Sequence, residues 1–192
     1  MLRSVSVRTS QNGLIAAAVA VCIGLIANPA TRAYADAEAS RGSWGVEAGL
    51  GFSADPAGIS FQFAFPVWLH RRFSLAPVGQ GNLANGHAFG ALTLNGRYTL
   101  RVSEPEASGL ARLGSFVDAG AGVAGVFDDG SRGGSTRSEG GLATNLGLGL
   151  DYRIVDGLSL VSVMRANYMP EELAGQNFIY TWYVLGLRYT VY

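Results

Sequence analysis

The chain has 192 residues and carries 14 basic and 14 acidic side chains, so its formal net charge is zero. The lack of a basic excess argues against a nucleic-acid partner, which favours a clustered basic surface. The length suits one domain, and after residue 35 no apolar run approaches the roughly 20 residues that a membrane-spanning helix needs.

The N-terminal segment has the features of a secretory signal peptide. Arg3 and Arg8 precede an apolar run over 14–27, and small residues at Ala35 and two positions before it fit a cleavage site. A transmembrane anchor is the alternative, but the apolar run is short for a span. We therefore predict that residues 1–35 are removed.

Cleavage would change the chemistry of the mature chain. It would remove three of the 14 basic residues, leaving 11 against 14 acidic ones and a net charge near −3. It would also remove Cys22, the one cysteine in the sequence, so no disulfide or thiolate metal site is expected. We predict neither a cofactor nor a metal.

After residue 42, apolar side chains alternate with small or polar ones, which is the pattern of β-strands with one apolar face. The clearest example is 44–52, where every second residue is apolar and the others are glycine or glutamate. The last strand follows a loop, and Tyr183 is predicted to point outward in it. The pattern predicts eight strands: 43–53, 59–70, 73–82, 88–101, 115–127, 142–153, 158–168 and a final strand ending near Val191.

Two prolines complicate this pattern. Pro66 and Pro77 lie inside predicted strands, where each removes one hydrogen-bond donor from the ladder. A two-residue turn between the second and third strands would point Phe73 and Leu75 inward. An odd-length turn or a bulge would point them outward, which is the arrangement we favour.

The apolar faces indicate how the strands assemble. No Arg, Asp or Glu falls on the apolar face of any strand whose phase is clear, and the chain has no second layer to cover that face. Lipid could cover it instead, and in lipid an open sheet edge is costly, whereas a closed barrel has no edge. The predicted fold class is all-β: an eight-stranded antiparallel up-and-down transmembrane β-barrel over 43–192, after a short linker at 36–42.

The predicted connections match this topology in part. Turns near 71 and 155 are short, as expected on the periplasmic side, whereas 128–140 and 169–177 are predicted to be long external loops. The 103–112 connection is long for a periplasmic turn.

Aromatic side chains fall near the predicted strand ends, at the level where rings favour the lipid headgroups. The predicted aromatic girdle consists of Trp44, Phe52, Tyr98, Phe127, Tyr152 and Tyr168.

The inward faces carry polar and charged residues. An eight-stranded barrel has an interior just wide enough for side chains, so we expect a polar plug, with a gated or selective narrow pore as the alternative. Two ion pairs are predicted, Arg97 with Asp118 and Glu47 with Arg188. The predicted lumen network consists of Glu47, Gln62, Asn95, Arg97, Asp118, Asn145, Asp151, Arg165 and Arg188.

Two motifs suggest ligand sites. Residues 120–125 match the GxGxxG dinucleotide fingerprint, but a loop and not a helix follows them, so we interpret the glycines as strand positions. Asp128, Asp129 and Glu139 could bind a cation, but their spacing matches no calcium loop, which favours a solvated loop.

The segment 147–160 (GLGLDYRIVDGLSL) and the ending 185–192 (LGLRYTVY) resemble the small eight-stranded outer-membrane barrels of the OmpA-type β-barrel superfamily. The resemblance implies a monomer in the outer membrane of a Gram-negative-type envelope, with a structural or surface-interaction role. Its implied partners are outer-membrane lipid and lipopolysaccharide and, during biogenesis, the barrel-assembly machinery and periplasmic chaperones. In this group the last strand is an assembly signal, which maps to Leu185, Leu187, Tyr189, Val191 and Tyr192, the last being out of phase.

Two other functions are alternatives to this role. Some barrels of this kind deacylate lipid A with a His-x-Ser pair, but Arg165 and Asn167 stand at those positions, although Glu171 is available downstream. Without a base and a nucleophile the chemistry cannot run, and His70 and His87 are expected in a turn and a loop, so no enzyme activity is predicted. The other alternative, a soluble lipocalin-type barrel, would expose the small-residue face to water with few charges.

Overall fold

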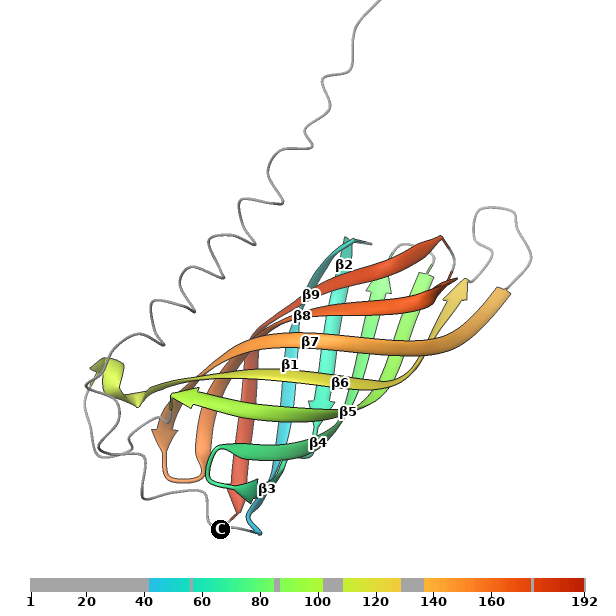
Figure 1. Cartoon of the computed structure of the whole chain (residues 1–192). Coiled ribbons are helices and arrows are strands. Elements are labelled where there is room, and N and C mark those ends of the chain that lie inside the picture. The colour runs from blue at the N-terminus through green and yellow to red at the C-terminus, as the bar shows by residue number, and fades with distance from the viewer. Residues whose placement is uncertain are drawn as a thin grey trace, which may run out of the picture.

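The computed structural model describes residues 42–55, 57–84, 87–101, 109–128, 137–173 and 175–191. Antiparallel strands in this part of the chain form one closed barrel (Figure 1), as the sequence predicted. Its elements are β1 (Trp44–Asp55), β2 (Ala57–Ala64), β3 (Val67–His70), β4 (Phe73–Ala84), β5 (His87–Arg101), the 3-10 turn η2 (Gly109–Arg112), β6 (Leu113–Asp128), β7 (Arg137–Val155), β8 (Leu158–Leu173) and β9 (Gln176–Val191). The predicted signal peptide over 1–35 lies outside the described residues.

The barrel has eight strands because β2 and β3 are two halves of one strand. Both pair with β1 on one side and with β4 on the other, and β9 pairs with β1 to close the sheet. Following paired residues once around the barrel from Asp128 leads back to β6 at Asp118, a displacement of 128 − 118 = 10 residues. Such a stagger goes with a strand tilt of about 40° and an interior that side chains can fill.

The two ends of the barrel differ in their connections. We call the end where β1 begins and β9 ends the terminal rim, because Trp44 pairs with Val191 there. The terminal rim also carries the β3–β4 turn, the η2 connection and the β7–β8 turn, and the opposite end is the distal rim. Among the described residues, no helix is both long and apolar enough to cross a bilayer.

The predicted alternation holds along most strands. On β7, Leu142 and Leu146 are exposed on the outer surface, whereas Asn145 and Asp151 are buried inside. Phe73 and Leu75 point outward, because a register shift between Trp68 and His70 adds one residue to the β3 side of the hairpin.

The two prolines lie beside one interruption of the ladder. Phe65 lies between β2 and β3, and Pro77 of β4 lies opposite it. The Pro77 carbonyl accepts a hydrogen bond from the Phe65 N–H at 3.1 Å. The Pro66 carbonyl accepts one from the Gly45 N–H at 2.8 Å. Both missing donors therefore fall at the point where the strand is already divided, and both proline carbonyls remain paired.

The prediction for Tyr183 was wrong. Its side chain is fully buried inside the barrel, while Val184 and Leu185 are both exposed. The pairing of β9 shifts by one residue here against both β1 and β8, which is a β-bulge. The bulge reverses the alternation, so the outward series of Leu185 does not continue back to Tyr183.

The predicted loops were too long. Asp128 and the segment 137–140 are paired in β6 and β7, and β8 and β9 extend to Leu173 and Gln176. His87, predicted in a loop, is the first residue of β5. The strands continue because neighbouring backbones still pair where the apolar alternation has ended.

An apolar layer fills part of the interior, which the sequence analysis did not predict. Two of its residues come from β5 and two from β6, with one residue each from β7, β8 and β9. Its members are Phe89, Ala91, Ala124, Val126, Ala143, Met169 and Ile179.

Candidate functional site

Among the residues that the structure describes, six charged side chains from six different strands are buried in the barrel interior. Each is less than a tenth exposed, and the three acids balance the three arginines in charge. They are Glu47, Asp118 and Asp151 with Arg97, Arg165 and Arg188. Buried charges are costly unless they are paired and hydrogen-bonded, so their arrangement determines whether the barrel is stable.

Four of these charges and one glutamine form a closed circuit, which we call the charge ring (Glu47, Arg97, Asp118, Arg165 and Gln62). Arg97 donates to both Glu47 oxygens, at 2.8 Å from Nη1 and 3.2 Å from Nη2, and to Asp118 Oδ2 at 3.3 Å. Arg165 donates to the same Asp118 oxygen at 2.7 Å and to Gln62 Oε1 at 2.9 Å. Gln62 Nε2 donates to Glu47 Oε1 at 3.2 Å, which completes the circuit.

An amide cluster adjoins the charge ring. Asn95 Nδ2 donates to Asn145 Oδ1 at 2.7 Å and lies 3.3 Å from Asp118 Oδ1. Asn145 in turn donates to the Thr93 hydroxyl at 2.8 Å. The Arg97 guanidinium also lies 4.0 Å from the Phe116 ring centroid, within cation–π range.

Arg188 links the charge ring to the third acid. It donates to Asp151 at 2.8 Å and lies 3.8 Å from Glu47. The predicted contacts Arg97–Asp118 and Glu47–Arg188 are therefore present, but in each pair one residue forms a shorter ion pair with another partner. Glu47 is held more closely by Arg97, and Arg188 by Asp151.

Glycines allow these side chains to meet across intervening strands. Asp118 pairs with Gly147, and Gly147 pairs with Arg165, so Asp118 reaches Arg165 over a position that has no side chain. In the same way Asn95 reaches Asn145 over Gly120. Gly120 belongs to the GxGxxG motif, whose residues lie within β6 as the strand interpretation predicted.

Another set of contacts inside the barrel was not predicted from the sequence. The Tyr183 hydroxyl donates to Gln80 Oε1 at 3.1 Å, and Gln80 Nε2 donates to Asn167 Oδ1 at 3.1 Å. Tyr183 was assigned to the wrong face because of the bulge. Gln80 was missed although it stands on the inward phase of its strand, two residues from Val78 and Asn82.

The residues of the predicted girdle and assembly signal lie mainly on the outer surface. Trp44, Phe52, Tyr98, Phe127, Tyr152 and Tyr168 are all exposed there. Leu185, Leu187 and Tyr189 are exposed on β9, Val191 is half-buried, and Tyr192 lies outside the described residues.

The positions considered for lipid A deacylation point into the barrel. Arg165 is part of the charge ring, and Asn167 contacts Gln80. Glu171 lies exposed near the distal rim. Within the described ranges, no three His, Cys, Asp or Glu side chains gather in a way that could hold a metal ion. Of the three residues considered for a cation site, Asp129 lies outside those ranges.

Neither a protein-family model nor a curated protein sequence matches the chain. Solved structures do. The N-terminal β-barrel domain of Pseudomonas aeruginosa OprF matches with a TM-score of 0.62 at 16% identity, covering 79% of this chain and 98% of that one. The chain has the fold of the small outer-membrane β-barrels. Neisserial surface protein A matches with a TM-score of 0.60 at 13% identity, over 80% and 99% of the two chains. Ail, the attachment invasion locus protein of Yersinia pestis, matches with a TM-score of 0.53 at 13% identity, over 79% and 100%.

Proposed function

We propose that the protein is an integral outer-membrane barrel with a closed lumen and a structural or surface-interaction role. Its outer surface supports the membrane assignment, because large apolar side chains stay exposed along every long strand, Leu92 and Leu146 at 60% each. A soluble protein rarely exposes so continuous an apolar surface, whereas a bilayer would cover it. The shared fold is consistent with this placement.

The charge ring is the main observation that supports a closed lumen. Its members come from β1, β2, β5, β6 and β8, and each is at most 3% exposed. Because the ring joins strands across the barrel, an ion could pass this level only if several buried ion pairs opened together. The apolar layer adds a second obstruction that offers an ion no polar partner.

The distal rim supports a surface-interaction role. β6 and β7, of 16 and 19 residues, are longer than β1 and β4, of 12 residues each, and form the hairpin at the right of Figure 1. With the terminal rim on the periplasmic side, this hairpin reaches the cell exterior. Lipopolysaccharide around the barrel, and the barrel-assembly machinery and chaperones during biogenesis, are the partners that such a placement implies.

Conductance of the reconstituted protein in planar bilayers tests the proposal. We expect no unitary current above that of the protein-free bilayer, in a sample whose insertion is established by co-flotation with lipid vesicles. A stable ion-sized current would favour the narrow-pore alternative. Failure to float with vesicles would instead contradict the membrane assignment.

A further inference from the structure

Within the described part of the chain, five arginines lie along the terminal rim, outside the lumen network. Arg71 and Arg72 form the β3–β4 turn, and the others stand at the ends of β5, η2 and β7: Arg101, Arg112 and Arg153. Asp156 is the one acid described on this rim outside the lumen, while Glu104 and Glu106 belong by sequence to the connection that precedes η2. The sequence has no lysine, so every cation here is a guanidinium, which binds phosphate in a bidentate manner.

The strand register places these arginines in one arc. Arg72 is linked to the end of β5 because its carbonyl accepts a hydrogen bond from the Thr99 N–H at 2.8 Å. Arg101 follows two residues later, and its side chain donates to the Leu110 carbonyl of η2 at 3.1 Å. Arg112 donates to the Ile154 carbonyl, beside Arg153, at 3.2 Å. The arc therefore runs along the rim from the β3–β4 turn to the end of β7.

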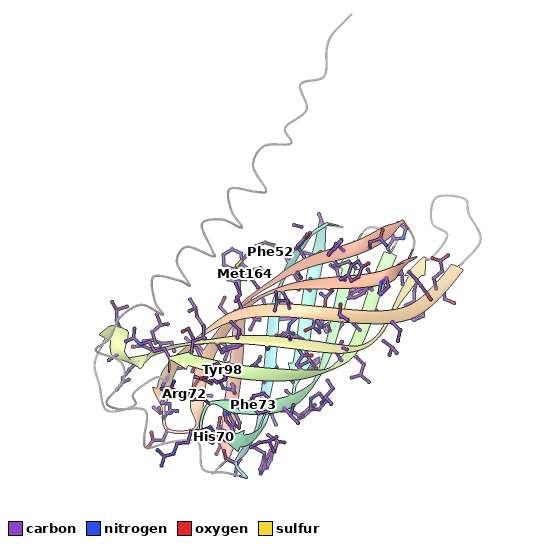
Figure 2. The ribbon with its side chains drawn as sticks, viewed as in Figure 1. Phe52, His70, Arg72, Phe73, Tyr98 and Met164 are labelled. Atoms are coloured by element: carbon purple, nitrogen blue, oxygen red, sulfur yellow. The ribbon has the colours of Figure 1, made fainter. Side chains whose placement is uncertain are left out.

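Lipid-facing aromatic side chains lie directly beside the first part of this arc. Phe73 pairs with Tyr98 across β4 and β5, and both are exposed on the outer surface. Figure 2 shows them at the same end of the barrel as His70 and Arg72, away from Phe52 and Met164. Because aromatic rings favour the headgroup level, Arg72 lies where a lipid phosphate would be.

From this arrangement we infer that the β3–β4 turn binds the headgroup of an anionic phospholipid in the leaflet that meets the terminal rim. Arg71 and Arg72 supply the positive charge, and Phe73 and Tyr98 contact the upper part of the acyl chains. The inference rests on the proposed function, because it requires the outer surface to be in lipid. It goes beyond that function by naming the lipid class and the residues that select it.

The test compares anionic and zwitterionic lipids next to Trp44. This side chain is exposed on the outer surface and pairs with Val67 of β3, the strand that leads into the turn. Trp182→Phe removes the second exposed tryptophan, while Trp68 is buried inside the barrel and serves as an unquenched background. The protein is reconstituted in phosphatidylcholine vesicles that contain brominated phosphatidylglycerol or brominated phosphatidylcholine, and quenching of fluorescence gives the relative affinity at this site.

We expect brominated phosphatidylglycerol to quench at several-fold lower mole fraction than brominated phosphatidylcholine. Arg71→Gln with Arg72→Gln should abolish that preference, because each arginine near the surface contributes up to about fivefold, whereas Arg137→Gln near the distal rim should leave it unchanged. Inorganic phosphate at millimolar concentration should not compete, because it lacks the acyl chains. If the double variant does not fold, the wild-type protein is measured at low and at high salt instead. Loss of its preference for the anionic lipid at high salt would then support the inference.

Equal quenching by both lipids in the wild type would overturn the inference and leave the membrane assignment intact. So would a preference that persists in the folded double variant or at high salt. Quenching by neither lipid would instead contradict the proposed function itself, because Trp44 would then not be in contact with a bilayer.

Discussion

Replacing Asp118 by asparagine is expected to lower the free energy of unfolding by about 3–5 kcal/mol, the usual result of leaving buried charges without their partner. The Asp118 carboxylate accepts hydrogen bonds from both Arg97 and Arg165, and both guanidiniums are at most 3% exposed. Asparagine keeps the size of the side chain but removes its charge. The measurement is urea-induced unfolding of the protein in lipid vesicles.

Two further variants separate charge from packing. Asp156→Asn lies in the exposed β7–β8 turn and should change stability by no more than about 0.5 kcal/mol. Adding Arg165→Gln to Asp118→Asn restores neutrality inside the barrel and should recover part of the loss. If Asp118→Asn behaved like Asp156→Asn, the charge ring would not be the stabilising element that the structure indicates.

Gly147→Ala is expected to cost about 1–3 kcal/mol, although alanine adds a single carbon atom. A Cβ at this position would overlap Asp118 Oδ1 and lie 3.1 Å from Asp118 Cγ and 3.3 Å from Arg165 Nε. The carboxylate cannot move away without losing an ion pair. The same unfolding measurement should therefore detect the substitution.

Gly79→Ala is the matched control for Gly147→Ala. Gly79 lies on the outer surface of β4, where a Cβ would meet nothing within 4 Å. The control should keep wild-type stability within about 0.5 kcal/mol. Equal effects of the two substitutions would indicate that strand propensity, and not access of Asp118 to Arg165, explains the glycine at 147.

The alternation of side chains was sufficient to predict the barrel and most of the faces. Leu92, Leu94 and Tyr98 point outward and Asn95 and Arg97 inward, because period two is a property of the extended backbone itself. The same periodicity failed at Tyr183. A bulge adds one residue without leaving a marker in composition, so only the pairing with β1 and β8 reveals it.

Most residues of the candidate site could be predicted from the sequence, but their contacts with one another could not. The sequence identifies Glu47 and Arg188 as inward residues of adjacent strands, and they do face each other. It does not show that Arg97 of β5 reaches across the lumen to Glu47 at 2.8 Å. That contact depends on strand tilt and on which neighbouring positions are glycine, which are properties of the closed barrel.

The outer-membrane assignment requires that one face of each strand contacts lipid while the other lines a closed interior. The most direct test is reaction of single cysteines with a lipid-soluble maleimide in vesicles, at five consecutive positions of β7 from Leu142→Cys to Leu146→Cys. We predict rapid labelling at 142, 144 and 146 and protection at 143 and 145, since Leu142, Thr144 and Leu146 are exposed and Ala143 and Asn145 are buried. Uniform labelling, or labelling of 143 and 145 alone, would contradict the account.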